Sequence, residues 1–152
     1  MKGKSDGNER ILWHGARRSC HMGERGNVNP CMIPRCSLCS IIRGSFDVGK
    51  IGTDTPGGRF GNGIYTFTKA SKASEHSVND KNVVTPWVPL LLSKVAAGHE
   101  CVMRHDNTTL TAPPQGYDSV IGEVRGRLNY DELVVYTNDA IRPTWLVMYQ
   151  RT

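Results

Sequence analysis

The chain has 152 residues, a length that suits one domain around one hydrophobic core. Apolar residues make up 38% of it, which is compatible with a globular fold, yet it has no run of about 18 apolar residues that could cross a membrane. The net charge of +5 is compatible with a solvated basic surface or with a patch that attracts nucleic acid, and no nucleic-acid-binding motif accompanies it.

The first part of the chain is expected to contain a tail, a strand and a helix. Residues 1–9 are polar and predict a flexible tail without the apolar core of a secretory signal, which favours a cytoplasmic or nuclear protein. Arg10–Gly15 (RILWHG) is an apolar run stopped by glycine, which predicts a buried strand. Residues 16–35 are irregular. A helix is expected from Cys36, because apolar residues then recur on one side: Leu38, Ile41 and Ile42.

The rest of the chain is rich in predicted strands. Gly63–Phe67 (GIYTF) has the β-branched and aromatic residues of a strand, and Thr68 is expected to cap a helix from Lys69 to about Val78. Further apolar runs predict strands at 87–98, 100–105, 118–124, 132–136 and 145–150. Because helices do not alternate with strands, the pattern favours an α+β fold over a doubly wound sheet.

The glycine-rich stretch Gly57–Ser77 (GGRFGNGIYTFTKASKASEHS) fits neither common phosphate-binding loop. A dinucleotide loop has its glycines between a strand and a helix, whereas these glycines precede a strand, and the Gly-Lys-Ser/Thr of a P-loop is absent. A plain turn into a strand is the simplest interpretation. The residues that follow favour a slot for a flat ring, lined by Tyr65 on the strand and by one face of the helix: Lys69, Ala73 and His76.

Four of the five cysteines lie close together in the sequence: Cys20, Cys31, Cys36 and Cys39. The Cys36-x-x-Cys39 spacing is typical of a zinc site, and the other two sulfurs, or His21 in place of one, would complete four ligands. Free thiols and disulfides are the alternatives. Cys101 lies on a predicted strand, where a buried thiol behaves as a small hydrophobic group.

Three motifs, in this order, resemble the catalytic domain of the poly(ADP-ribose) polymerases, which are diphtheria-toxin-like ADP-ribosyltransferases: LWHG, RFGNGIYTF with SKAS, and NYDELVVY. The flanking stretches LLLSKVAAG and LVVYTNDAIRPTWLVMYQ resemble the neighbouring strands of that family. The resemblance covers about residues 10–150 and is closest to small fungal members that share the cysteine-containing insert. It implies an ADP-ribosyltransferase fold with split, antiparallel-rich sheets and few helices. One catalytic domain would span 10–152, with the cysteine-rich insert at about 16–46.

The same resemblance implies roles for individual residues. The His-Tyr-Glu triad of the family falls on His14, Tyr65 and Glu132. His14 would hold the adenosine ribose of NAD, the backbone of Gly15 would pair with the nicotinamide carboxamide, and Tyr65 would stack on the nicotinamide ring. Glu132 would bind the 2′-hydroxyl of the nicotinamide ribose and activate the acceptor. Beside these residues, the NAD-binding set contains Gly63, Ala73 and His76.

Two of these positions depart from the family pattern. Ala73 stands where the family has the second serine of S-K-S, and His76 stands where it has a second stacking tyrosine. The slot therefore lacks a hydrogen bond worth roughly 0.5–1.5 kcal/mol and has a smaller second wall, so we expect weaker nicotinamide binding than in other members.

The implied function is transfer of ADP-ribose from NAD to an acceptor with release of nicotinamide. Single-unit transfer to a protein is favoured, because the short segment His99–Leu128 leaves little room for a loop that holds a polymer; a nucleic-acid acceptor is also compatible. We expect a monomer without an autoinhibitory helical domain, DNA-binding module or membrane segment. The alternatives are an NAD glycohydrolase and a non-catalytic binding module with an altered slot.

Overall fold

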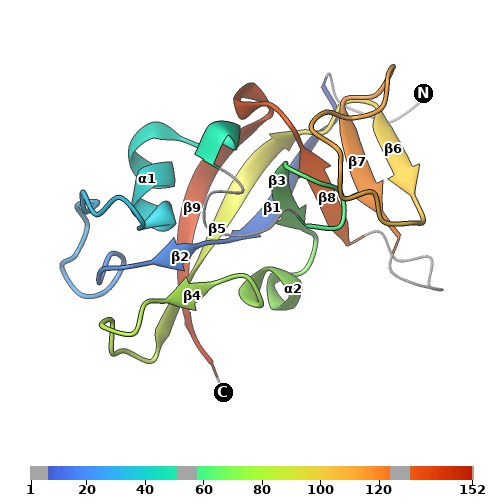
Figure 1. Ribbon diagram of the computed structural model, residues 1–152. Coiled ribbons are helices and arrows are strands. Elements are labelled where there is room, and N and C mark those ends of the chain that lie inside the picture. Colours follow the sequence, from blue (N-terminus) through green and yellow to red (C-terminus); the bar gives the residue numbers. More distant parts are fainter. Residues whose placement is uncertain (1–6, 51–57, 124–130, 152) are drawn as a thin grey trace.

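The computed structural model describes residues 7–50, 58–123 and 131–151, and most of its regular structure is strand (Figure 1). The strands in these residues are β1 (Glu9–Gly15), β2 (Arg17–Arg18), β3 (Ile64–Phe67), β4 (Val78–Asn79), β5 (Trp87–Ala96), β6 (Glu100–Met103), β7 (Ser119–Gly122), β8 (Glu132–Val135) and β9 (Ile141–Gln150). The helices are α1 (Ser37–Gly44), α2 (Ala70–Ser74) and the short 3-10 helices η1 (Val48–Lys50) and η2 (Asn138–Ala140). None of these helices has the length and apolar character needed to cross a bilayer.

Within the described residues, seven strands form one sheet in the order β6-β7-β8-β3-β1-β5-β9. Its neighbours are antiparallel except β6 and β7, which run parallel. β2 and β4 pair in parallel as a separate small sheet. The predicted α+β class, with antiparallel-rich sheets and few helices, is confirmed. The strands that carry His14, Tyr65 and Glu132 are adjacent in the middle of the large sheet.

The two α-helices cover opposite faces of this sheet. Leu90 and Leu91 are consecutive on β5 and therefore point to opposite faces. Leu91 packs in a core cluster with Leu38 of α1. Leu90 packs in another core cluster, with Ala73 of α2 and Phe67 of β3. Figure 1 shows β1 and β5 passing between the two helices. Burial of each such leucine stabilises the fold by roughly 1.5–3 kcal/mol.

The predicted flexible tail extends too far. Residues 1–6 lie outside the described residues, but the chain is anchored from Asn8 onward. The Asn8 amide donates to the Gly98 carbonyl at 3.0 Å and to Glu100 at 2.8 Å, and β1 begins at Glu9. The anchor is a long-range one, so the polar composition of the segment could not reveal it.

The prediction of a helix from Lys69 to about Val78 capped by Thr68 is wrong in both respects. α2 ends at Ser74, and Val78 lies in β4, where it pairs with Arg17 of β2. The Thr68 hydroxyl donates to the Asp131 carboxylate at 2.8 Å rather than capping the helix, and Lys69 is the residue at the cap position. Tertiary pairing therefore overrides the local helical pattern.

The last strand is longer than predicted. β9 begins at Ile141, because the segment expected to separate the final two strands pairs with β5 as far as Val95, across a register shift at Leu92/Ser93. Short β2 interrupts the stretch expected to be irregular. Gly57, the end of the strand expected at 118–124, and residues 124–128 of the segment His99–Leu128 lie outside the described residues.

Candidate active site

Tyr65 and Glu132 lie on one face of two neighbouring strands. β3 and β8 pair antiparallel with Tyr65 opposite Val134 and Phe67 opposite Glu132. Tyr65 and Glu132 are therefore diagonal neighbours on the same face, a relation that places two residues about 7–8 Å apart and their β-carbons somewhat closer. Burial of Tyr65 raises its pKa, to about 12, and the nearby Glu132 charge adds to this effect.

The strand end that carries Glu132 is held by the residue before it. Asp131 is buried, with its side-chain carboxylate accepting from the Thr68 hydroxyl at 2.8 Å and its main-chain carbonyl accepting from the Thr68 amide at 2.9 Å. Lys69 lies 3.5 Å from the same carboxylate. Asp131 is not among the site residues predicted from the sequence. The turn after β3 is thus tied to the start of β8, which limits movement of Glu132.

Glu132 is a largely buried carboxyl group. Its side chain is 15% exposed, and burial raises its pKa, an effect that the Arg59 guanidinium opposes. Arg59 Nη1 lies 3.6 Å from Glu132 Oε2. A carboxylate in this setting can stabilise a nearby positive charge and can accept a proton more readily than an exposed one.

The Tyr65 ring has a fixed position beside the glycine-rich turn. Its hydroxyl donates to the Gly61 carbonyl at 2.7 Å and accepts from the Phe60 amide at 3.0 Å. A β-carbon on Gly58 would lie 2.7 Å from the ring, so glycine is needed there. The hydroxyl is protonated and both donates and accepts within the turn. Tyr65 is therefore better suited to stacking on a flat ring than to donating a proton to a substrate.

His14 lies near the end of β1, and its side chain bonds to the main-chain carbonyl of Tyr65. Its Nδ1 is 2.7 Å from the Tyr65 carbonyl, and its ring meets Phe46 edge-on at 4.9 Å. A carbonyl oxygen only accepts, so Nδ1 carries the proton and Nε2 offers a lone pair. Burial, opposed by the bond to the Tyr65 carbonyl and assisted by nearby His76, lowers the pKa of His14 to about 4, so the imidazole is neutral at pH 7. By strand alternation, His14 shares the face of Leu12 rather than that of Tyr65.

Of the residues predicted to bind nicotinamide, Gly15 meets α2 and the turn after it, whereas Gly63 packs against β8. A β-carbon on Gly15 would lie 2.2 Å from the Ala73 carbonyl oxygen, and one on Gly63 would lie 2.3 Å from Val134 Cγ1. Ala73 is fully buried. His76 lies beyond the end of α2 and stacks on Phe67, with ring centroids 5.0 Å apart. The prediction that one helix face carries Lys69, Ala73 and His76 is therefore wrong.

The structure brings the four predicted metal-ligating cysteines together. The Sγ atoms of Cys20, Cys31, Cys36 and Cys39 all lie within 4.8 Å of one another. Cys20 Sγ is 3.9 Å from Cys36 Sγ and 3.5 Å from Cys39 Sγ. Four sulfurs about 2.3 Å from a tetrahedral zinc ion stand about 3.8 Å apart, whereas a disulfide needs about 2.05 Å. The donor set and its spacing therefore fit zinc.

Main-chain and ionic contacts fix this cysteine cluster. The Ser19 amide donates to Cys36 Sγ at 3.3 Å, and the Met22 amide donates to Cys20 Sγ at 3.4 Å. Such N–H···S bonds orient metal-binding thiolates. Beside them, buried Asp80 accepts from the Ser19 hydroxyl at 2.6 Å and pairs with arginines on two segments, Arg17 at 2.6 Å and Arg35 at 3.0 Å. His21 points instead to Glu24, at 3.0 Å, and is not part of the cluster.

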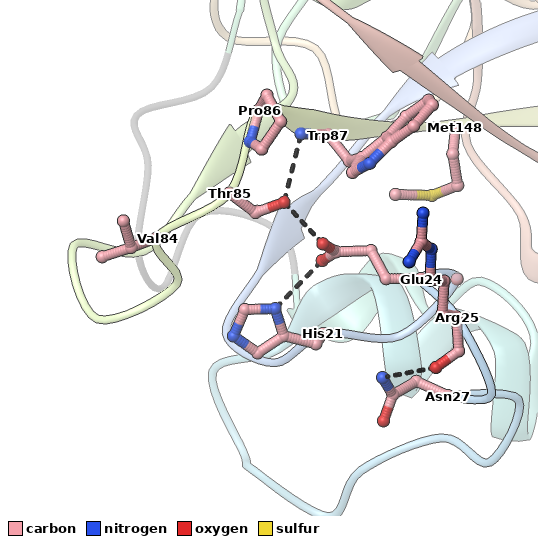
Figure 2. A pocket seen from close by; sticks show the side chains of 10 residues that line it. His21, Glu24, Arg25, Asn27, Val84, Thr85, Pro86, Trp87 and Met148 are labelled. Carbon is pink, nitrogen blue, oxygen red and sulfur yellow. Dashed lines mark hydrogen bonds and ion pairs between the residues drawn. The ribbon is translucent and has the colours of Figure 1, made fainter.

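A cavity of about 490 Å³ lies elsewhere, between the 21–27 loop and the start of β5. Figure 2 shows Glu24 in its wall, bonded to His21 and Thr85. Trp87 and Met148 supply its apolar side. Neither His14, Tyr65 nor Glu132 lines it, so the cavity is separate from the candidate active site.

The family model of the poly(ADP-ribose) polymerase catalytic domain matches residues 35–127. The chain belongs to this family. The matched range contains Gly63, Tyr65, Ala73 and His76, whereas His14, Gly15 and Glu132 lie outside it.

A curated relative in the same family is the human protein mono-ADP-ribosyltransferase PARP3, which is 28% identical over 115 residues. The aligned part is 76% of this chain but 18% of the human protein. The chain thus spans less than a fifth of the length of this relative, and the similarity concerns one part of it.

The approach of β1 to α2 can be tested by adding a methyl group at Gly15. Because the new β-carbon in Gly15→Ala would meet main-chain atoms of Ala73 and His76, we expect the free energy of unfolding to fall by about 1–3 kcal/mol. Denaturant unfolding followed by tryptophan fluorescence measures this change. Gly44→Ala is the matched control, since a β-carbon there meets no atom within 4 Å. Equal stability of the two variants would contradict the close approach.

Proposed function

We propose that this chain is an NAD-dependent ADP-ribosyltransferase that transfers one ADP-ribose unit to a protein acceptor and releases nicotinamide. The observation that carries the proposal is the placement of Tyr65 and Glu132 as diagonal neighbours on one face of β3 and β8, in a chain of the poly(ADP-ribose) polymerase family. The name of the human relative, a protein mono-ADP-ribosyltransferase, supports single-unit transfer and a protein acceptor. A nucleic-acid acceptor remains compatible with the net charge of +5.

The chemistry divides among the residues by type. The aromatic face of Tyr65 can stack on the flat, cationic nicotinamide ring. The neutral His14 presents Nε2 as an acceptor, which suits a ribose hydroxyl. Gly15 is the last residue of β1, and the family resemblance assigns its peptide groups to the nicotinamide carboxamide.

Glu132 is assigned the charge and proton chemistry. When the bond from nicotinamide to ribose breaks, its electron pair leaves with nicotinamide and the ribose acquires oxocarbenium character. The Glu132 carboxylate stabilises this positive charge. The acceptor oxygen then bonds to the ribose carbon, and its proton passes to Glu132. With water as acceptor, the same steps give the alternative activity, NAD hydrolysis.

The nicotinamide side of the site offers fewer contacts to the ring and its carboxamide than the family pattern does. Ala73 offers no hydroxyl to the carboxamide, and His76 stacks on Phe67, in an exposed position. This arrangement motivates the other alternative, a non-catalytic module. We favour an enzyme, because a module without catalysis would not require a buried carboxyl group next to Tyr65.

Incubation with NAD labelled in the adenosine half separates the three functions. We expect release of nicotinamide together with label on protein; release without label on macromolecules would indicate hydrolysis. In Glu132→Gln we expect the rate to fall by at least about 100-fold, because the amide accepts no proton. Glu75→Gln, at an exposed position, should retain the rate. No release by the intact chain at any protein concentration would refute both enzymatic functions.

We also propose that Cys20, Cys31, Cys36 and Cys39 hold a structural zinc ion. The mutual distances of the sulfurs and the amide bonds to two of them support this assignment. Zinc would fix the irregular insert that precedes α1 and would stabilise the folded state. A four-thiolate site suits a reducing compartment, which agrees with the proposed cytoplasmic or nuclear location.

Metal analysis of the purified chain tests the zinc site. We expect about one equivalent of zinc per chain, because four thiolates close a structural site. Cys39→Ser should lose most of this zinc, whereas Cys101→Ser, on β6, should keep it. Less than about one-tenth of an equivalent in the intact chain, prepared without chelator, would reject the site.

A further inference from the structure

Arg59 connects three separate segments at the edge of the candidate active site. Its Nε donates to the Asp106 carboxylate at 2.8 Å, its Nη2 donates to the Glu123 carbonyl at 3.2 Å, and its Nη1 lies 3.6 Å from Glu132. The side chain is 29% exposed. No local sequence pattern indicates a role for Arg59, because its partners are distant in sequence and converge on it only in the fold.

The glycine opposite Glu132 makes room for the Phe60 ring, over which the Arg59 side chain lies. Gly122 of β7 is the cross-strand partner of Glu132. A β-carbon on Gly122 would lie 2.5 Å from the Phe60 ring and 3.6 Å from Arg59 Nη1. The guanidinium of Arg59 lies over the Phe60 ring, 4.9 Å from its centroid.

The backbone around Arg59 is held as firmly as its side chain. The Asn107 amide donates to the Arg59 carbonyl at 2.8 Å, and the Tyr136 hydroxyl donates to the Phe60 carbonyl at 2.7 Å. The Asn62 amide donates to the Leu110 carbonyl at 2.9 Å, which ties the glycine-rich turn to the same loop. The guanidinium therefore has little freedom to leave Glu132.

Other charged groups near Glu132 act from a greater distance. Lys72 of α2 attracts the Glu132 charge and Asp106 repels it, while Tyr65 lies on the same face. Lys69 is engaged with Asp131. In the part of the chain that the structure describes, Arg59 is the cation within ion-pair distance of Glu132.

We propose that Arg59 is a positioning residue for Glu132, which orients the buried carboxylate and keeps it charged, with Asp106 holding the guanidinium in place. The role of Arg59 in catalysis rests on the proposed transferase function, whereas the ion pair between Arg59 and Glu132 does not. Burial favours the protonated acid, which could not accept the proton of the acceptor, and Arg59 opposes that effect. The pKa of Glu132 should therefore rise when the guanidinium is removed.

The test is a titration of the Glu132 carboxyl carbon by NMR in ¹³C-labelled protein, with Glu132→Gln used to assign the resonance. In Arg59→Gln we expect the pKa of Glu132 to rise by about one unit or more, because an opposite charge within about 4–6 Å is lost. Arg59→Lys keeps the charge and should restore part of the difference. Arg104→Gln is the control, since Arg104 is 72% exposed and pairs with Glu123; the pKa should stay unchanged.

Activity gives a second, independent result. Glu132 must be deprotonated to act, so the acid limb of the rate of nicotinamide release should move to higher pH in Arg59→Gln, with kcat affected more than KM for NAD. Identical Glu132 pKa values in the unaltered chain and in Arg59→Gln would overturn the inference. If Arg59→Gln fails to fold, Arg59→Lys carries the test. A Glu132 pKa in Arg59→Lys below that of the unaltered chain would then overturn the inference as well. A chain that releases no nicotinamide while its Glu132 pKa responds to Arg59 would refute the transferase and leave the pairing established.

Discussion

The register between β3 and β8 is the constraint on which the candidate site depends. It sets Phe67 opposite Glu132 and thereby places Tyr65 and Glu132 on the same face of the sheet. A shift by one residue would turn every side chain of one strand to the other face and separate the pair. Thr68 and Asp131 lock this register from the side, because both the main-chain and the side-chain groups of Asp131 accept bonds from Thr68. The buried strand residues Ile64, Leu133 and Val135 secure it from the core.

β1 links this pair to the rest of the molecule. Its last residues contact β3 through the His14–Tyr65 bond and α2 through the close approach of Gly15. His14 also meets Phe46, which follows α1 and shares its core cluster with Leu38 and Cys39. The cysteine cluster at the start of α1 is therefore connected to the candidate site by a continuous set of packed residues. Zinc bound there would act on the site through order in α1 rather than through chemistry.

Much of this arrangement could be predicted from sequence, because the informative patterns are local. The apolar runs predict the strands that carry His14, Tyr65 and Glu132, and the Cys36-x-x-Cys39 spacing anticipates a cluster whose four sulfurs the structure brings together. The family itself is confirmed by the match over residues 35–127. The roles of single residues within the site stay predictions.

The features that escaped prediction are set by contacts distant in sequence. A helix past Ser74 satisfies local preferences, but pairing of Val78 with Arg17 ends it. Arg59 looks like an ordinary surface residue until Asp106, Glu123 and Glu132 converge on it. No residue pattern around His76 indicates that its ring stacks on Phe67 instead of lying opposite Tyr65.

We propose that Tyr65, Gly15 and Glu132 surround the nicotinamide riboside half of NAD. A crystal structure with a non-hydrolysable NAD analogue tests it most directly. We expect the nicotinamide ring against Tyr65, its carboxamide on the backbone of Gly15, and the ribose 2′-hydroxyl within hydrogen-bond distance of Glu132. An analogue bound in the cavity beside Trp87, or with its nicotinamide ribose out of reach of Glu132, would contradict it.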